Sequence, residues 1–356
     1  MSSVRRIMLA PMEGVTDFHM RKILTDVFHY DRCVTEFVRV TDGVYPQRVF
    51  LRSCPELLTG GRTQNGVPVY VQLLGSDTNA MAANAKRLVE LGAPGIDLNF
   101  GCPAKKVNRH GGGSVLLRTP DTVKNIVDAV RDAVDPSIPV TAKIRLGFEN
   151  SDYLLEIAKG IEEAGAAELC VHARTRMDGY KPPAHWSEVR KVRAELTIPV
   201  IVNGEIWSVE DACKACSDSQ CVDLMLGRGA LAVPDLANQI GADAGSQNYC
   251  VLEWQEVLYL LEELLATGSE LPTKTAGNRT KQWLSYLIRG YPGARELFSE
   301  IKRFREYELL MAVIKRHRVS LPSHDSSSYY TGSKVTGSKV TGSKALSAGY
   351  VSSLPC

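Results

Sequence analysis

The chain has 356 residues, of which 44% are hydrophobic and 23% are charged. It can bury a large core, and its length allows one large α/β domain with an appendage, or two domains. The 42 basic and 40 acidic side chains leave a net charge of +2, so total charge favours no class of partner. No apolar run approaches the ~20 residues of a membrane span, and the run before Met12 is too short for a signal peptide. We therefore expect a cytoplasmic protein with no membrane partner.

The nine cysteines are odd in number and scattered, and several lie inside apolar, strand-like runs. This pattern fits reduced thiols in a reducing compartment better than a disulfide framework. Cys213 and Cys216 have the spacing of half a zinc site, but no second Cys or His pair stands at a suitable interval. The segment from Val209 to Cys216 has a helical pattern, so we expect no metal.

Taken in chain order, eight short β-branched runs alternate with amphipathic segments. The expected strands are 7–10, 33–40, 67–74, 95–99, 139–146, 168–174, 198–203 and 222–226, and the clearest helices between them are 79–91, 121–134, 153–164, 187–196 and 209–215. This alternation implies parallel strands joined by right-handed crossovers. Eight units predict an α/β fold of the (β/α)8 TIM-barrel type, although periodicity alone also allows an open, doubly wound sheet.

Unusual polar residues follow the expected strands one after another, and this favours the barrel. They are Gln72, Asn99, Cys102, Lys143, Arg145, His172, Arg174, Asn203, Glu205 and Arg228. The carboxyl ends of barrel strands meet at one rim, where TIM barrels build their active sites. The glycine turns around Gly204 and Gly227 lie after the last two strands, a common place for a phosphate group. We therefore expect a phosphorylated cofactor or substrate there.

Cys102 ends a short apolar strand, and the basic, glycine-rich loop that follows contains Lys105, Lys106 and three glycines from Gly111. A thiol in this position is typical of a reactive centre. The alternative is a buried cysteine at a tight turn, because free cysteine often acts as a small core residue.

Beyond the barrel, helical patterns at 254–265, 279–289, 294–304 and 307–316 predict a small helical bundle. Between Lys274 and Arg318, eleven Lys or Arg stand against four Glu, a local charge of +7. After Ser320 the composition shifts to Ser, Thr, Gly and Lys, with a repeated Thr-Gly-Ser-Lys unit, which is typical of disorder. We expect a catalytic barrel at 1–250, a helical domain at 251–320 and a low-complexity tail at 321–356.

Seven motifs occur together in order: PMEGVTD from Pro11, QLLG from Gln72, NFGCP from Asn99, KIRLG from Lys143, HART from His172, NGEI from Asn203 and GRGA from Gly227. Over residues 5–318 the sequence resembles the tRNA-dihydrouridine synthase family. Segments 35–39 and 281–287, and Glu205 where many relatives carry Asp, are similar to the bacterial subfamily C. That subfamily acts on uridine 16 in the D-loop of tRNA.

The resemblance implies an FMN-binding barrel, a C-terminal domain that binds tRNA, and NADPH as the reductant. Cys102 is then the catalytic proton donor. The implied FMN contacts are Pro11, Met12, Glu13, Gln72, Lys143, His172, Asn203, Gly204, Glu205, Gly227 and Arg228. The implied RNA contacts are Glu36, Asn99, Tyr180, Arg145, Arg279, Lys281 and Lys302. A monomer without metal is expected.

This chemistry suits the residues. Reduction of the uracil C5–C6 bond needs a hydride at C6 and a proton at C5, and an ordinary cysteine, with a pKa of about 8.5, holds its proton at neutral pH. Lys143 can neutralise charge on a reduced flavin, and a base flipped out of the tRNA can meet Asn99 and Arg145. Two alternatives are an FMN barrel acting on a free pyrimidine, as in dihydroorotate dehydrogenase, and a tRNA-binding protein that has lost catalysis. Lys302 and His110 depart from the family pattern, which leaves position 16 less firmly implied than the reaction.

Overall fold

The computed structural model describes residues 4–243, 249–267 and 273–319. Its parallel strands form one closed barrel, in the order β2-β1-β9-β8-β7-β6-β5-β4-β3, and the additional pairing of β2 with β4 closes the ring. The strands are β1 (Arg6–Leu9), β2 (Arg32–Val34), β3 (Val38–Arg39), β4 (Val69–Leu74), β5 (Ile96–Asn99), β6 (Val140–Arg145), β7 (Glu168–His172), β8 (Val200–Asn203) and β9 (Asp223–Leu226). The predicted TIM barrel is confirmed.

The expected strand 33–40 is two short strands, β2 and β3, with a break at residues 35–37. Thr35 causes the break with its side chain: its hydroxyl accepts a hydrogen bond from Gln72 N at 3.0 Å and donates to the carbonyl of Glu36 at 2.8 Å. These bonds replace part of the regular ladder. Glu36 therefore lies outside both strands, and its carboxylate accepts a hydrogen bond from Val15 N at 3.1 Å.

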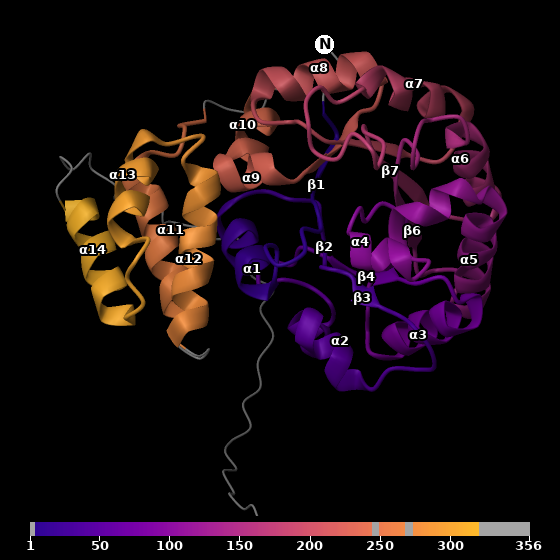
Figure 1. Cartoon of the computed structure of the whole chain (residues 1–356), viewed down its shortest axis with the longest axis horizontal. Helices are drawn as coiled ribbons and strands as arrows, with labels where there is room; N and C mark the ends of the chain where they lie inside the picture. Colours follow the sequence, from indigo (N-terminus) through magenta and orange to yellow (C-terminus); the bar gives the residue numbers. More distant parts are fainter. Residues whose placement is uncertain (1–3, 244–248, 268–272, 320–356) are drawn as a thin grey trace, which may run out of the picture.

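Helices form a ring around the strands, with α3, α5, α6, α7 and α8 following one another along its outside (Figure 1). Their bounds, with the shorter helices of the connecting loops, are α1 (Phe18–Val27), α2 (Gln47–Ser53), η1 (Pro55–Thr59), α3 (Thr78–Glu90), α4 (Lys105–Arg109), η2 (Gly113–Arg118), α5 (Pro120–Ala133), α6 (Leu154–Glu163), α7 (Trp186–Glu195), α8 (Val209–Ser219), α9 (Arg228–Ala232) and α10 (Leu236–Asp243). Asp17, Asp77 and Ser208 cap the N-termini of α1, α3 and α8 with their side chains. The helices predicted from periodicity agree with these bounds to within a few residues.

The apolar side chains divide into two cores. The larger core lies between the strands and the surrounding helices and continues into the C-terminal helices. The smaller one fills the barrel interior and consists of Met8, Ala10, Val34, Cys170, Ile201 and Met225. Because side chains alternate along a strand, these residues point inward while their neighbours point to the helices. Ala10 and Met225 also line the pocket above, so this inner core forms its floor.

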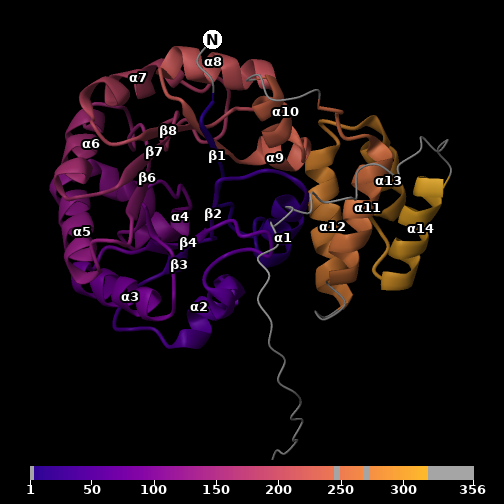
Figure 2. The same cartoon turned by 180° about the vertical axis from the view of Figure 1, so that it is seen from behind.

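Four C-terminal helices form a bundle at one side of the barrel (Figure 2). They are α11 (Trp254–Thr267), α12 (Thr273–Leu287), α13 (Pro292–Ile301) and α14 (Tyr307–Val319). α11 packs against α1, and α12 packs against α9. Trp283 is 1% exposed, and its indole N–H donates to the carbonyl of Leu231 at 3.1 Å. The predicted tail at 321–356 lies outside the described residues.

A buried ion pair joins α1 to η1 beside the barrel. The guanidinium of Arg21 donates through Nε and Nη2 to both oxygens of Glu56, each at 2.9 Å. Its other bonds go to the carbonyls of Thr16 and Ser53. The side chains are 0% and 3% exposed, and a buried charge that loses its partner is strongly destabilising.

We expect Glu56→Gln to lower the free energy of unfolding by about 3 kcal/mol, because it leaves the Arg21 charge uncompensated. The measurement is the urea midpoint of the purified protein. Glu149→Gln is the matched control, because its pair with Arg118 is 52% and 51% exposed and should contribute little. Equal midpoints for the two variants would contradict the buried pair's role.

Candidate active site

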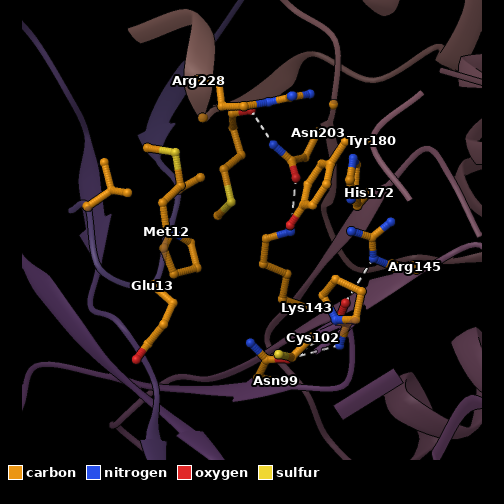
Figure 3. Close-up of a pocket in the computed structure, with 18 of the residues that line it drawn as sticks. Met12, Glu13, Asn99, Cys102, Lys143, Arg145, His172, Tyr180, Asn203 and Arg228 are labelled. Carbon is orange, nitrogen blue, oxygen red and sulfur yellow. Dashed lines mark hydrogen bonds between the residues drawn. The ribbon is translucent and has the colours of Figure 1, made fainter. Parts of the chain in front are cut away.

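A pocket of about 510 Å³ opens at the carboxyl ends of the strands (Figure 3). Residues from most of the strand ends line it, together with Tyr286 of α12. The predicted residues that it brings together are Pro11, Met12, Glu13, Glu36, Gln72, Asn99, Cys102, Lys143, Arg145, His172, Tyr180, Asn203, Gly204, Glu205, Gly227 and Arg228. The predicted rim is therefore one physical site, except for Arg174, which is fully buried behind the pocket and bonds to Glu205 and to the carbonyl of Lys181.

The thiol of Cys102 stands at one side of this pocket, in the loop after β5. The loop is tightly held, because the carbonyl of Cys102 accepts hydrogen bonds from Asn108 Nδ2 at 2.8 Å and from the hydroxyl of Ser114 at 2.9 Å. Gly113 packs against it with φ +68°, and a Cβ there would lie 2.8 Å from the Cys102 carbonyl. Burial raises the pKa of the Cys102 thiol, so the thiol keeps its proton at neutral pH.

Asn99 and Arg145, both expected to meet RNA, are engaged within the protein. The side-chain oxygen of Asn99 accepts hydrogen bonds from Gly101 N at 3.0 Å and Cys102 N at 2.9 Å. Arg145 is 2% exposed and donates to the carbonyls of Gly101, Thr175 and Gly179 at 2.9–3.1 Å. Both side chains therefore shape the loops around the pocket while they also line it.

Lys143 points from β6 into the middle of the pocket (Figure 3). Its ammonium donates to the side-chain oxygen of Asn203 at 2.9 Å, and Asn203 Nδ2 donates to the carbonyl of Met225 at 2.8 Å. Burial lowers the pKa of Lys143, and the positive charge of Arg145 lowers it further. An anion bound beside the ammonium would offset both effects.

His172 lies at the end of β7, under a close backbone approach. Gly204 has φ +112°, and a Cβ there would lie 2.5 Å from the imidazole, so only glycine fits this turn. Burial holds the pKa of His172 well below its usual value, and the charges of Arg145 and Lys143 act in the same direction. The imidazole is therefore neutral at neutral pH.

Arg228 sits at the opposite side of the pocket from Cys102 (Figure 3). Its guanidinium lies 4.9 Å from the centre of the Tyr180 ring and 5.0 Å from that of Trp207. It approaches Glu205 only at 3.7 Å, since that carboxylate bonds to Arg174. Arg228 thus keeps hydrogen-bonding capacity toward the pocket, where it can bind an anion.

Glu13 and Glu36 lie on the wall formed by the loops after β1 and β2. Burial raises the pKa of Glu13, and the nearby charge of Glu36 raises it further. Burial likewise raises the pKa of Glu36, followed by the charge of Asp17. This wall of the pocket therefore carries carboxyl groups, in contrast to the cationic wall of Lys143 and Arg228.

Three of the predicted RNA contacts lie outside the pocket, on the helical bundle. Arg279 pairs with Asp17 at 2.5 Å and donates to the carbonyl of Val15 at 2.8 Å, so it ties α12 to the loop before α1. The ammonium of Lys281 donates to the carbonyl of Phe304. Lys302 is exposed at the end of α13.

Sequence reasoning missed aromatic residues that also line the pocket. Trp207 follows the NGEI motif directly and contacts Arg228 and Arg289, whose guanidinium lies 3.9 Å from the indole centre. Tyr286 comes from α12. The position of Trp207 next to a motif was a usable signal, whereas that of Tyr286 depends on how the bundle packs against the barrel.

Among the described residues, no group of three or more His, Cys, Asp or Glu is arranged to hold a metal ion. Within the same residues, no helix is long and apolar enough to span a membrane.

Comparison with known proteins identifies the family. The sequence pattern of the family described as dihydrouridine synthase matches residues 8–315. The chain belongs to the dihydrouridine synthase family. Its relatives include proteins named tRNA-dihydrouridine(16) synthase from Shewanella oneidensis, Vibrio parahaemolyticus and Pseudomonas putida. They are 49%, 48% and 49% identical to this chain; the matches cover 87%, 90% and 84% of it and 98%, 99% and 93% of the relatives.

The raised pKa of Cys102 predicts how this family member reacts with alkylating agents. Iodoacetamide attacks the thiolate, so labelling of Cys102 should rise with pH at a midpoint above the value of about 8.5 for free cysteine. Peptide-resolved mass spectrometry across a pH series measures this midpoint, with the urea-unfolded protein as the reference. A midpoint at or below that of the unfolded protein would show that burial does not control the thiol.

Proposed function

We propose that this protein reduces uridine 16 in the D-loop of tRNA to 5,6-dihydrouridine, with FMN as cofactor and NADPH as reductant, in the cytoplasm. Family membership and the relatives at 48% and 49% identity support the reaction and the position. The structural observation that carries the proposal is that the half-buried thiol of Cys102 lies in the same pocket as the side chains of Lys143 and Arg228.

The pocket has the properties that a flavin mononucleotide site needs. Its volume of about 510 Å³ is in the usual range for cofactor pockets. Gly204 and Gly227 bring backbone close to the cavity, and Arg228 can pair with a phosphate. We assign FMN binding to Pro11, Met12, Glu13, Gln72, Lys143, His172, Asn203, Gly204, Glu205, Gly227 and Arg228. When bound and reduced, FMN would supply the hydride for C6 of the uracil.

The protein's own residues supply the other requirements of the reaction. Cys102 holds a proton at Sγ and donates it to C5 of the uracil, as general acid. Lys143 lies deep in the pocket, where burial lowers its pKa. A negative charge beside it would favour the protonated ammonium, and the ammonium would stabilise that negative charge. Neutral His172 adds a hydrogen-bonding group without adding charge.

The substrate base must leave the tRNA stack to enter such a pocket. We propose that Tyr180, which is 55% exposed, stacks on the flipped base, since aromatic rings bind bases in this way. Asn99, Arg145 and Glu36 then contact the edges of the base with the groups that their internal bonds leave free.

We propose further that Arg279, Lys281 and Lys302 contact the RNA backbone from the helical bundle, acting as the tRNA-binding domain at 251–320. Arginine has five N–H donors and lysine three, so the internal bonds of Arg279 and Lys281 leave donors for phosphate. Lys302 has its side chain exposed. The local charge of +7 in this part of the chain supports binding to a polyanion.

The test uses the purified protein, NADPH and tRNA that lacks dihydrouridine. We expect a flavin absorption spectrum and dihydrouridine formed in the tRNA but not from free uridine. Reduction of a free pyrimidine alone would favour the dihydroorotate dehydrogenase-like alternative. A protein that binds tRNA and forms no dihydrouridine would favour the silent binding protein.

Cys102→Ala should reduce the single-turnover rate on tRNA by at least about 100-fold, the usual contribution of general acid catalysis. Flavin content and tRNA affinity should stay unchanged, because only the proton donor is removed. Cys213→Ala, on the outside of the barrel in α8, is the control and should keep full activity. Normal turnover by the Cys102 variant would refute the assignment.

Lys302→Ala should weaken tRNA binding and reduce the slope of log K against log salt concentration by about one, as expected for one lost phosphate contact. Lys86→Ala, an exposed lysine of α3 on the far side of the barrel from the bundle, should leave the slope unchanged. Fluorescence anisotropy over a salt series measures both. The same slope for Lys302→Ala and the wild type would exclude this contact.

A further inference from the structure

A line of buried side chains connects the inside of the barrel to the backbone of Cys102. Gln72 Nε2 donates to one oxygen of Asp97 at 2.6 Å, and Asn99 Nδ2 donates to Gln72 Oε1 at 2.7 Å. The side-chain oxygen of Asn99 then accepts from Gly101 N and Cys102 N. Three neighbouring elements, β4, β5 and the loop after β5, are linked in this way.

These side chains are shielded from water. Gln72, Asp97 and Asn99 are 0%, 2% and 9% exposed, so a polar group left without its partner would cost the full desolvation penalty. Thr141 completes the set, since its hydroxyl donates to the second oxygen of Asp97 at 2.5 Å. A reversed amide anywhere in this line would leave buried groups unpaired.

The groups at the two ends of this line determine the donor-to-acceptor direction of its hydrogen bonds. Backbone N–H groups can only donate, and an ionised carboxylate can only accept. The amides of Gln72 and Asn99 lie between these ends, and each could be turned by half a rotation. Only one combination of the two amide orientations places a donor against an acceptor at every link.

The single orientation of the two amides therefore requires Asp97 to be ionised, because only a carboxylate accepts at both oxygens. Burial raises the pKa of this carboxyl group, while the hydrogen bonds from Gln72 and Thr141 and the charges of Arg32 and Lys143 favour the carboxylate. Because the pKa of Asp97 is raised, a pH above neutrality favours its carboxylate form.

We infer that Asp97 is a positioning residue: by fixing the orientation of the Gln72 and Asn99 amides, it sets the position of the Cys102 thiol in the pocket. The inference rests on the proposed function only for the thiol's role as proton donor. Asp97 itself lines no part of the pocket and acts through the two amides.

Asp97→Asn tests the inference, because asparagine has nearly the same shape but offers both a donor and an acceptor. The side-chain amide of Gln72 could then adopt either orientation, and so could that of Asn99. The loop of Cys102, which is held by Asn99, would no longer have a single position. In the flavin-loaded protein at a pH of about 8.5, we expect peptide-resolved alkylation of Cys102 by iodoacetamide to become several times faster. The kcat on tRNA should fall about tenfold, with KM within about twofold of the wild type. An alkylation rate and a kcat both within about twofold of the wild type would overturn the inference.

Asp223→Asn is the matched control. Asp223 is also a buried aspartate, with 2% of its side chain exposed, but it pairs with Arg5 and Arg6 at the opposite end of the barrel. Its substitution should leave the alkylation rate of Cys102 unchanged. Faster alkylation in this variant too would mean general loosening of the barrel and would overturn the inference.

The double variant Asp97→Asn with Gln72→Glu provides a rescue. The carboxylate then lies at position 72 and accepts a hydrogen bond from Asn99, so the amide of Asn99 again has only one favourable orientation. Because Gln72 is also an assigned FMN contact, this comparison uses the wild type and both variants free of flavin. We expect the alkylation rate of Cys102 to return to within about twofold of the wild type; a rate as fast as that of Asp97→Asn, or as fast as that of the unfolded protein, would overturn the inference. This readout needs no substrate, so wild-type protein that forms no dihydrouridine would refute the proposed function and leave the positioning role standing.

Discussion

The parallel sheet closes into a ring, and this closure determines where the active site forms. The pairing of β2 with β4 completes the ring, and a closed ring brings the carboxyl ends of all strands to one rim. Side chains separated by more than 200 residues, from Met12 to Arg228, then face a single pocket. The inner core beneath them, from Met8 to Met225, prevents the pocket from extending through the barrel.

Positively charged side chains and carboxyl groups line different parts of this pocket. Burial keeps His172 neutral, and the positive charges of Lys143, Arg145 and Arg228 act in the same direction. These cations also favour an anionic ligand. Glu13 and Glu36 line another part of the pocket, and burial raises the pKa values of both. Cys102 lies where burial keeps its thiol protonated. An acid and an anion-binding cation therefore coexist in one cavity, as reduction of an uncharged base by a bound flavin requires.

The apolar runs and the polar residues that follow them were together sufficient to predict the barrel and most residues of its rim, because period-two alternation and strand order determine which side chains reach the carboxyl edge. It could not predict the internal partners of those side chains. Arg145 bonds to three loop carbonyls, and Arg279 bonds to Asp17, which depends on loops and helix packing rather than on periodicity. The break between β2 and β3 depends on one hydroxyl, that of Thr35, and β propensity gave no sign of it.

If the proposed function is correct, this pocket couples a bound flavin to one uridine of tRNA. A single turnover tests it most directly: the flavin of the holoenzyme is reduced, NADPH is removed, and tRNA lacking dihydrouridine is added without oxygen. We predict that the flavin is reoxidised at the rate at which dihydrouridine appears, with one dihydrouridine at position 16 for each flavin. A flavin that stays reduced in the presence of tRNA, or dihydrouridine at another position, would contradict the account.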